Sequence, residues 1–114
     1  MKRFLKVMKA LSDPSRVKII KMLQHKAMCV CEIQACLTLA QPTISKHLKI
    51  LEDADLVLFS KDGLWVNYKL SNDKANPYAG SMIKYLKRSL NDDPEIEKIV
   101  NRLPYINREK ICKK

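Results

Sequence analysis

The chain has 114 residues, of which 46% are hydrophobic and 30% charged, and its formal net charge is +10 at pH 7. This length allows one domain with a modest core, and the charge indicates an anionic partner, either nucleic acid or a membrane surface. No apolar run approaches the ~20 residues of a membrane span. Lys6 and Lys9 interrupt the N-terminal segment that would otherwise resemble a signal peptide. We therefore expect a cytoplasmic protein without a membrane partner.

The first half of the chain predicts four helices. Apolar residues at helical spacing indicate a first helix over about residues 2–11. Ser12-Asp13-Pro14 predicts a break and a restart, because Asp13 can cap a helix and proline fits its first turn. The expected helices that follow are one carrying Val17, Ile20 and Leu23 on one face, a short one over about residues 30–37, and a longer one from Gln41-Pro42 to about Ala54.

The second half changes to strand-forming residues. Leu56–Ser60 and Leu64–Leu70 predict two strands, and Lys61-Asp62-Gly63 predicts the tight turn of a β-hairpin between them. Asn76-Pro77 and Asp92-Asp93-Pro94 then open two further helices, the last reaching about Leu103. This order, α-α-α-α-β-β-α-α, predicts a mainly α winged helix-turn-helix. We assign residues 1–103 to a DNA-binding and dimerisation domain and residues 104–114 to a charged C-terminal tail.

The fourth predicted helix has the features of a DNA-reading helix. On a wheel of about 100° per residue, Ile44, Leu48 and Leu51 fall on one side. Such a helix enters the major groove with its N-terminal residues nearest the bases. An ordinary amphipathic helix is the alternative, but the short helix before it, the hairpin after it and the net charge favour DNA. We expect Gln41 and Thr43 to contact base edges, and Ser45, Lys46 and Lys49 to contact phosphates.

For His47 and Lys61, the sequence allows either a contact to DNA or a role that does not involve DNA. His47 lies toward the apolar edge of the wheel, where it forms either a hydrogen-bonded packing contact or a phosphate contact. Lys61 in the hairpin is either a wing contact to a flanking phosphate or a solvated lysine.

A dimer reading two half-sites is expected, because sequence-specific affinity from one such module is limited. The helix after the hairpin supplies a candidate interface together with the first helix, although the same residues also suit packing within one protomer. Its apolar stripe consists of Tyr78, Met82, Tyr85, Leu86 and Leu90.

The four cysteines fit a reducing compartment, where ligands, reactive thiols or core positions are more common than structural disulfides. Cys29 and Cys31 lie too close in sequence for an unstrained disulfide, and the pair favours binding of a thiophilic ion. Cys36 alone suits a small buried hydrophobe. Cys112 lies near the end of the chain.

Several motifs together resemble the ArsR/SmtB family of metal-responsive repressors. Met28-Cys29-Val30-Cys31-Glu32-Ile33 is similar to the family's arsenic and cadmium/lead motif, Leu-Cys-Val-Cys-Asp-Leu. Residues 11–16, 41–51 and 63–70 resemble the family's opening, DNA-reading helix and wing return, and the likeness covers about residues 4–90. It implies a homodimeric repressor that leaves its double-stranded operator DNA when thiolates capture As(III), Sb(III) or a soft divalent ion such as Cd(II) or Pb(II).

The chain also departs from the family pattern. Arsenic-sensing relatives often have a third cysteine where Gln34 stands, a glycine usually stands at Asp55, and the usual wing arginine is Ser60, which leaves Lys61 to substitute. No cysteine precedes Cys29, unlike cadmium/lead sensors. Residues 77–90 also lack the Asp and His pairs that zinc, nickel and cobalt sensors carry there, so that site is absent.

The spacing of the thiols predicts a mechanism. On a regular helix Cys29 and Cys31 lie about 200° apart, and Cys36 lies about 10 Å further along the axis. Gathering them around one ion therefore requires the first turn to unwind, which would shift the fourth helix. The third ligand of the ion is Cys36, Cys112 or a thiol from the buffer, and the sequence does not decide among them.

Three alternatives remain. Oxidation of Cys29, Cys31 or Cys36 would make a thiol-redox repressor of the same fold. A thiol enzyme is disfavoured, because the chain has no C-x-x-C motif and no histidine or lysine clearly placed to activate a thiolate. We accordingly expect no small-molecule substrate and no organic cofactor. The third alternative is an architectural DNA-binding protein that senses no ligand.

Overall fold

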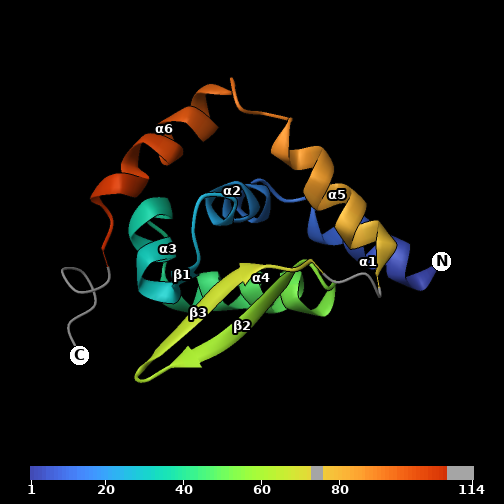
Figure 1. The fold of residues 1–114 in the computed structure, drawn as a ribbon, viewed down its shortest axis with the longest axis horizontal. Coiled ribbons are helices and arrows are strands. Elements are labelled where there is room, and N and C mark those ends of the chain that lie inside the picture. Colours follow the sequence, from blue (N-terminus) through green and yellow to red (C-terminus); the bar gives the residue numbers. More distant parts are fainter. Residues whose placement is uncertain (73–75, 108–114) are drawn as a thin grey trace.

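The computed structural model describes residues 1–72 and 76–107. This part of the chain forms six α-helices, three strands and one 3₁₀ turn (Figure 1). The elements are, in order, α1 (Lys2–Ala10), α2 (Pro14–Leu23), β1 (Met28–Cys29), α3 (Val30–Leu37), α4 (Gln41–Asp53), β2 (Val57–Asp62), β3 (Trp65–Leu70), α5 (Pro77–Lys87), α6 (Pro94–Arg102) and η1 (Leu103–Tyr105). The order confirms the predicted winged helix-turn-helix. The short strand β1 is an addition that the sequence pattern did not predict.

Three helices begin with the same local device, an Asp or Asn cap followed by proline. The Asp13 carboxylate accepts a hydrogen bond of 2.8 Å from the Ser15 backbone N–H at the start of α2. Asn76 caps α5 and Asp93 caps α6 in the same way. Side-chain acceptors satisfy backbone donors that have no partner within the helix, and the predicted starts of these three helices are confirmed.

α2 lies at the centre of the molecule, and the other helices surround it (Figure 1). Its Ile19, Ile20 and Met22 side chains have no exposed surface. α1 and α5 pack against each other at one end, while α6 packs against α2 and α3 at the other. The chain beyond α6 still contacts the body, because Ile106 packs against the core. The boundary at residues 103/104 stays a prediction. No helix in the described ranges is long and apolar enough to span a membrane.

The three strands form one antiparallel sheet in the order β1-β3-β2. The hairpin is confirmed, but the predicted turn at residues 61–63 is wrong. Lys61 and Asp62 pair with Val66 and Trp65, so the turn consists of Gly63 and Leu64. Gly63 has a φ of 63°, which suits the residue without a Cβ. The ladder therefore runs further than the Asp-Gly signal indicated, and Lys61 lies within β2.

A buried lysine holds the C-terminal end of α5. Lys21 on α2 is 1% exposed. Its Nζ donates to the carbonyl oxygens of Leu86 (2.6 Å) and Ser89 (2.8 Å) and to Oδ1 of Asn91 (2.7 Å). The last carbonyls of a helix lack intrahelical partners and favour a cation. Burial lowers the pKa of Lys21, while hydrogen bonds to these acceptors favour its charged form. This contact fixes α5 on the central helix.

The end of α4 meets the start of α5 through a second polar contact. Asp55 adopts the left-handed conformation with a φ of 63°. Its Oδ2 accepts a hydrogen bond of 2.9 Å from Nδ2 of Asn76, the buried cap of α5. Aspartate tolerates this conformation better than most residues with a Cβ.

We expect Asp55→Ala to lower the free energy of unfolding by about 2 kcal/mol, because the Asn76 amide loses its acceptor and alanine is disfavoured at positive φ. Asp55→Asn keeps an acceptor oxygen and should change the free energy by less than about 0.5 kcal/mol. Urea denaturation at one protein concentration measures both. Equal losses in the two variants would show that the contact to Asn76 contributes little.

Candidate functional site

α3 and α4 form the helix-turn-helix pair. α3 ends at Thr38, whose left-handed conformation has a φ of 55°, and α4 begins at Gln41 with Pro42 in its first turn. The buried residues of α4 are Ile44, Leu48 and Leu51, as the helical wheel predicted. The opposite face is open to solvent and carries the polar residues that were expected to contact DNA: Gln41, Thr43, Ser45, Lys46 and Lys49.

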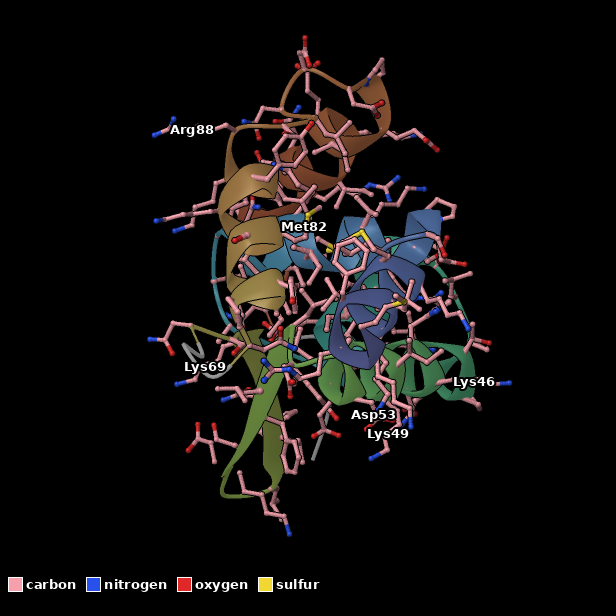
Figure 2. The ribbon with its side chains drawn as sticks, turned by 90° about the vertical axis from the view of Figure 1, so that its right-hand side faces the viewer. Lys46, Lys49, Asp53, Lys69, Met82 and Arg88 are labelled. Atoms are coloured by element: carbon pink, nitrogen blue, oxygen red, sulfur yellow. The ribbon has the colours of Figure 1, made fainter. Side chains whose placement is uncertain are left out.

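The two lysines of α4 differ in their surroundings. Lys46 projects away from the molecule (Figure 2). Lys49 forms ion pairs with Asp53 (Nζ to Oδ1, 3.3 Å) and Glu52 (Nζ to Oε1, 3.5 Å) on the same helix. The hydrogen bond and charge of Asp53, together with Glu52, raise the pKa of Lys49. A phosphate must therefore compete with two carboxylates for Lys49, whereas no ion pair of Lys46 occurs within the described residues.

His47 adopts the hydrogen-bonded packing position. Its Nδ1 lies 3.2 Å from Nη1 of Arg16 on α2, a bond in which the guanidinium is the donor. Arg16 also donates to the carbonyl oxygens of Ala10 (Nε, 2.7 Å) and Lys9 (Nη2, 3.3 Å) at the end of α1. Arg16 thus joins α1, α2 and α4, a role that sequence reasoning missed because these partners are distant or backbone groups. A phosphate contact by His47 stays a prediction.

The hairpin projects from the body beside α4 (Figure 1). Lys61 is exposed on β2, and Leu64 in the turn is 74% exposed. On the hairpin, the Phe59 and Tyr68 rings lie 6.1 Å apart as a cross-strand pair. Burial raises the pKa of Tyr68, and β2 of the hairpin packs against α4. The hairpin and α4 thus present neighbouring polar and cationic surfaces.

Cys29 lies immediately before α3, in agreement with the helix predicted over about residues 30–37. It is the N-cap of α3 and the last residue of β1, with extended backbone angles (φ −88°, ψ 169°). The helical angle of about 200° does not apply to this pair, because Cys31 lies on α3 whereas Cys29 precedes it with an extended backbone. The Cys29 side chain accepts the Glu32 backbone N–H, and Oε1 of Glu32 accepts the Cys29 backbone N–H at 2.9 Å. This reciprocal pair is a capping box with sulfur in place of the usual hydroxyl.

The three cysteines of this region have unequal access to solvent. Cys29 is 3% and Cys36 1% exposed, and burial raises the pKa of both thiols. Cys31 is partly exposed and lines a surface depression of about 440 Å³ with Gln34, Ala35 and Thr38. Cys29 and Cys36 are free thiols, whereas Cys31 is disulfide-bonded in the structure. Cys112 lies outside the described residues.

A preassembled metal site does not occur in residues 1–72 and 76–107, where no three His, Cys, Asp or Glu side chains come together as a metal would need. Cys36 lies in the hydrophobic core, and its backbone carbonyl accepts a hydrogen bond of 3.0 Å from Nη1 of Arg102 on α6. Binding of one ion by Cys29, Cys31 and Cys36 therefore requires local rearrangement. The ligand role of each cysteine stays a prediction.

β1 connects the cysteine motif to the hairpin. Cys29 pairs with Asn67 of β3, and Asn67 pairs on its other side with Ser60 of β2, the residue before Lys61. Because hydrogen bonds of the antiparallel ladder join these strands, a displacement of Cys29 would act directly on the hairpin. α3 gives a second route, since it packs against α4.

Comparisons with known proteins place these features in a family. The sequence profile described as "Bacterial regulatory protein, arsR family" matches residues 13–58. An "Uncharacterized HTH-type transcriptional regulator" of Methanocaldococcus jannaschii is 44% identical over 69 residues, covering 60% of this chain and 78% of its own length. The "Arsenical resistance operon repressor" of Escherichia coli K12 is 38% identical over 68 residues, which are 59% of this chain and 58% of that protein.

A solved structure gives the same fold. "Reduced HlyU from Vibrio cholerae N16961" is 30% identical, with a TM-score of 0.64 and coverage of 76% of this chain and 87% of that chain. The fold and the relatives are those of DNA-binding transcriptional regulators.

The unequal surroundings of the two lysines generate a prediction. Lys46→Ala should weaken binding to a mixed-sequence DNA duplex and lower the slope of log K against log salt by about 1 for each bound copy of the chain, the loss of one phosphate contact per copy. Lys49→Ala should have a smaller effect on both quantities, because Glu52 and Asp53 already hold Lys49. Fluorescence anisotropy at several salt concentrations measures the slopes. A larger change for Lys49→Ala would mean that the carboxylates do not compete with DNA.

Proposed function

Because this chain belongs to the ArsR family of DNA-binding transcriptional regulators, we propose that it is a homodimeric cytoplasmic repressor that leaves operator DNA when its cysteines bind As(III) or Sb(III). Cd(II) and Pb(II) are the alternative inducers. The observation that carries the proposal is the position of Cys29, which joins β1 to α3 and pairs with the hairpin strand β3.

The exposed face of α4 supports the DNA-binding part of the proposal. Gln41 and Thr43 lie in the first turn of α4, where base contacts are expected, and Lys61 on the hairpin lies on the neighbouring surface for a flanking phosphate. The relatives named as repressors make release from DNA the expected regulatory event.

Exposed aromatic side chains on α1 and α5 support a dimer. Phe4 is 40% exposed, although its ring packs edge-on against Tyr78 at 5.5 Å, and Tyr85 is 64% exposed. Large rings at one end of two packed helices favour an interface between copies. A dimer brings two copies of α4 to two half-sites on the DNA.

Thiol chemistry supports the choice of inducer. As(III) and Sb(III) are soft ions that prefer thiolates, as are Cd(II) and Pb(II). Cys31 is the accessible member of the pair, and Cys29 is the buried one. Binding requires both cysteines in reduced form, with the disulfide of Cys31 opened. The chemistry of the third ligand suits Cys36 or Cys112 of the chain, or a thiol from solution.

The energetic cost of the rearrangement is compatible with such a switch. Turning the Cys29 sulfur toward an ion shared with Cys31 breaks the capping box with Glu32, and loss of a cap costs about 0.5–2 kcal/mol. Couplings between two sites in allosteric proteins are typically about 1–3 kcal/mol. Movement of α3 then displaces α4, and movement of β1 displaces the hairpin. Both DNA-contacting elements lose their alignment together.

We expect the Cys29→Ser/Cys31→Ser protein to keep its affinity for DNA and to lose its response to As(III). Serine is a better helix cap than cysteine, so the start of α3 is retained. In the unchanged protein, As(III) should weaken DNA binding by about 5- to 150-fold under reducing conditions. Anisotropy of labelled operator DNA, titrated with As(III), Sb(III), Cd(II), Pb(II) and Zn(II), measures the response.

Cys36→Ala tests the third ligand separately, because it removes a buried thiol but leaves the Cys29–Cys31 pair. A double variant that still releases DNA with As(III) would refute the assignment of Cys29 and Cys31. Loss of the response in Cys36→Ala, with DNA affinity unchanged, would identify Cys36 as the third ligand.

Oxidation of thiols is a second candidate signal, favoured by the disulfide state of Cys31 and by the fact that one structural relative was described in a reduced form. Under this alternative, peroxide changes the affinity for DNA in the absence of any metal ion, and Cys31→Ser abolishes that change. The metalloid proposal instead gives stoichiometric binding of As(III) to the reduced protein, which the redox alternative does not require.

A further inference from the structure

A cavity of about 650 Å³ lies between the end of β3 and the outer side of α5. Its apolar lining includes Leu70, Pro77 and Ile83, and its polar lining includes Ser71, Lys84 and Lys87. Cavities of this size with a mostly apolar lining and a few polar groups are typical binding sites for small molecules. This cavity lies far along the chain from the cysteine motif and plays no part in the proposed response to thiophilic ions.

The charged side chains that line the cavity within the described residues, Lys84 and Lys87, are both positive. Lys84 and Lys87 line both this cavity and a neighbouring depression of about 870 Å³, where Arg88 is added. No carboxylate is among the described residues that line either space, and no ion pair of these cations occurs within residues 1–72 and 76–107. An anionic group between Lys84 and Lys87 would therefore meet two unneutralised ammonium groups.

This side of α5 adjoins the face proposed for dimerisation, because Tyr85 lines the neighbouring depression but not the cavity itself. On a wheel of about 100° per residue, Lys84 and Lys87 lie about 100–160° from Tyr85. In Figure 2, Arg88 of α5 and Lys69 of β3 lie on the opposite side of the view from Lys46. The cavity is lined by the end of β3 and by α5, and no residue of α4 is among the described residues that line it.

We propose that this cavity is a binding site for a small organic anion with an apolar body, such as a medium-chain carboxylic acid. The carboxylate lies between Lys84 and Lys87, and the alkyl chain lies against Leu70, Pro77 and Ile83. Gly80 also lines the cavity, and a Cβ added there meets no atom within 4 Å. The absence of a side chain at Gly80 thus contributes to the space available for the ligand.

A ligand in this site contacts two elements with different roles. Leu70 is the last residue of the hairpin strand β3 and Ser71 follows it, while Lys84 and Lys87 belong to α5 of the proposed dimer. Occupancy therefore links the position of the hairpin to that of α5. The site gives the protein a second input, independent of its cysteines.

The test is isothermal titration of the full-length protein with decanoate below its micelle concentration, with decanol as the uncharged counterpart. One decanoate should bind per chain, and decanol should bind much more weakly. Lys84→Gln/Lys87→Gln should weaken decanoate binding about tenfold or more, because charge-assisted contacts are lost. Lys9→Gln/Lys98→Gln removes the same charge from exposed positions on α1 and α6 and should leave binding unchanged.

A steric pair of variants tests the location without changing any charge. Gly80→Phe fills the cavity and should abolish decanoate binding, whereas Gly80→Ala adds only a Cβ and should retain it. Circular dichroism confirms folding of each variant. Failure of decanoate to bind, equal binding of decanol, or unchanged binding in Gly80→Phe would overturn the proposal. The proposal would also be overturned if the unchanged protein did not bind decanoate and Lys84→Gln/Lys87→Gln lost affinity for DNA. The two lysines would then contact DNA phosphates.

Discussion

The reciprocal hydrogen bonds between Cys29 and Glu32 are the contact on which the proposed mechanism depends. Through them one residue closes the strand β1 and starts the helix α3. The backbone of Cys29 is paired to β3, while α3 is packed against α4. A change in the bonding of one sulfur atom therefore acts on the hairpin and on α4. A cap is weak enough to be broken by a ligand, and its position is central enough for the break to matter.

The large positive charge of the chain serves several purposes. Lys21 is buried under the end of α5, and Arg16 joins three helices through backbone carbonyls and His47. Lys49 is held by two carboxylates of its own helix. Only part of the charge therefore remains free for an external anion. The exposed cations fall into at least two separate groups, one on α4 and one on the outer side of α5, which is why we assign them different ligands.

Much of the fold follows from local signals in the sequence. Asp13-Pro14, Asn76-Pro77 and Asp93-Pro94 start helices because a side-chain acceptor and a fixed φ act within a few residues. The buried side of α4 follows from its 3.6-residue period. The turn of the hairpin lies at residues 63–64 and not at the predicted 61–63, because an Asp-Gly pair indicates a turn but does not set how far the ladder continues. β1 could not be predicted, since two residues form a strand only when a partner strand is present.

The sequence by itself determined the family, the polar face of α4 and the pair of cysteines, because each depends on residue type and short spacing. Only the tertiary structure decided what those residues contact. It paired Cys29 with β3 and made it the cap of α3, set His47 against Arg16, and opened a lysine-lined cavity between β3 and α5. These outcomes depend on which distant segments pack together, and the packing is decided by burial of the whole core rather than by any local pattern.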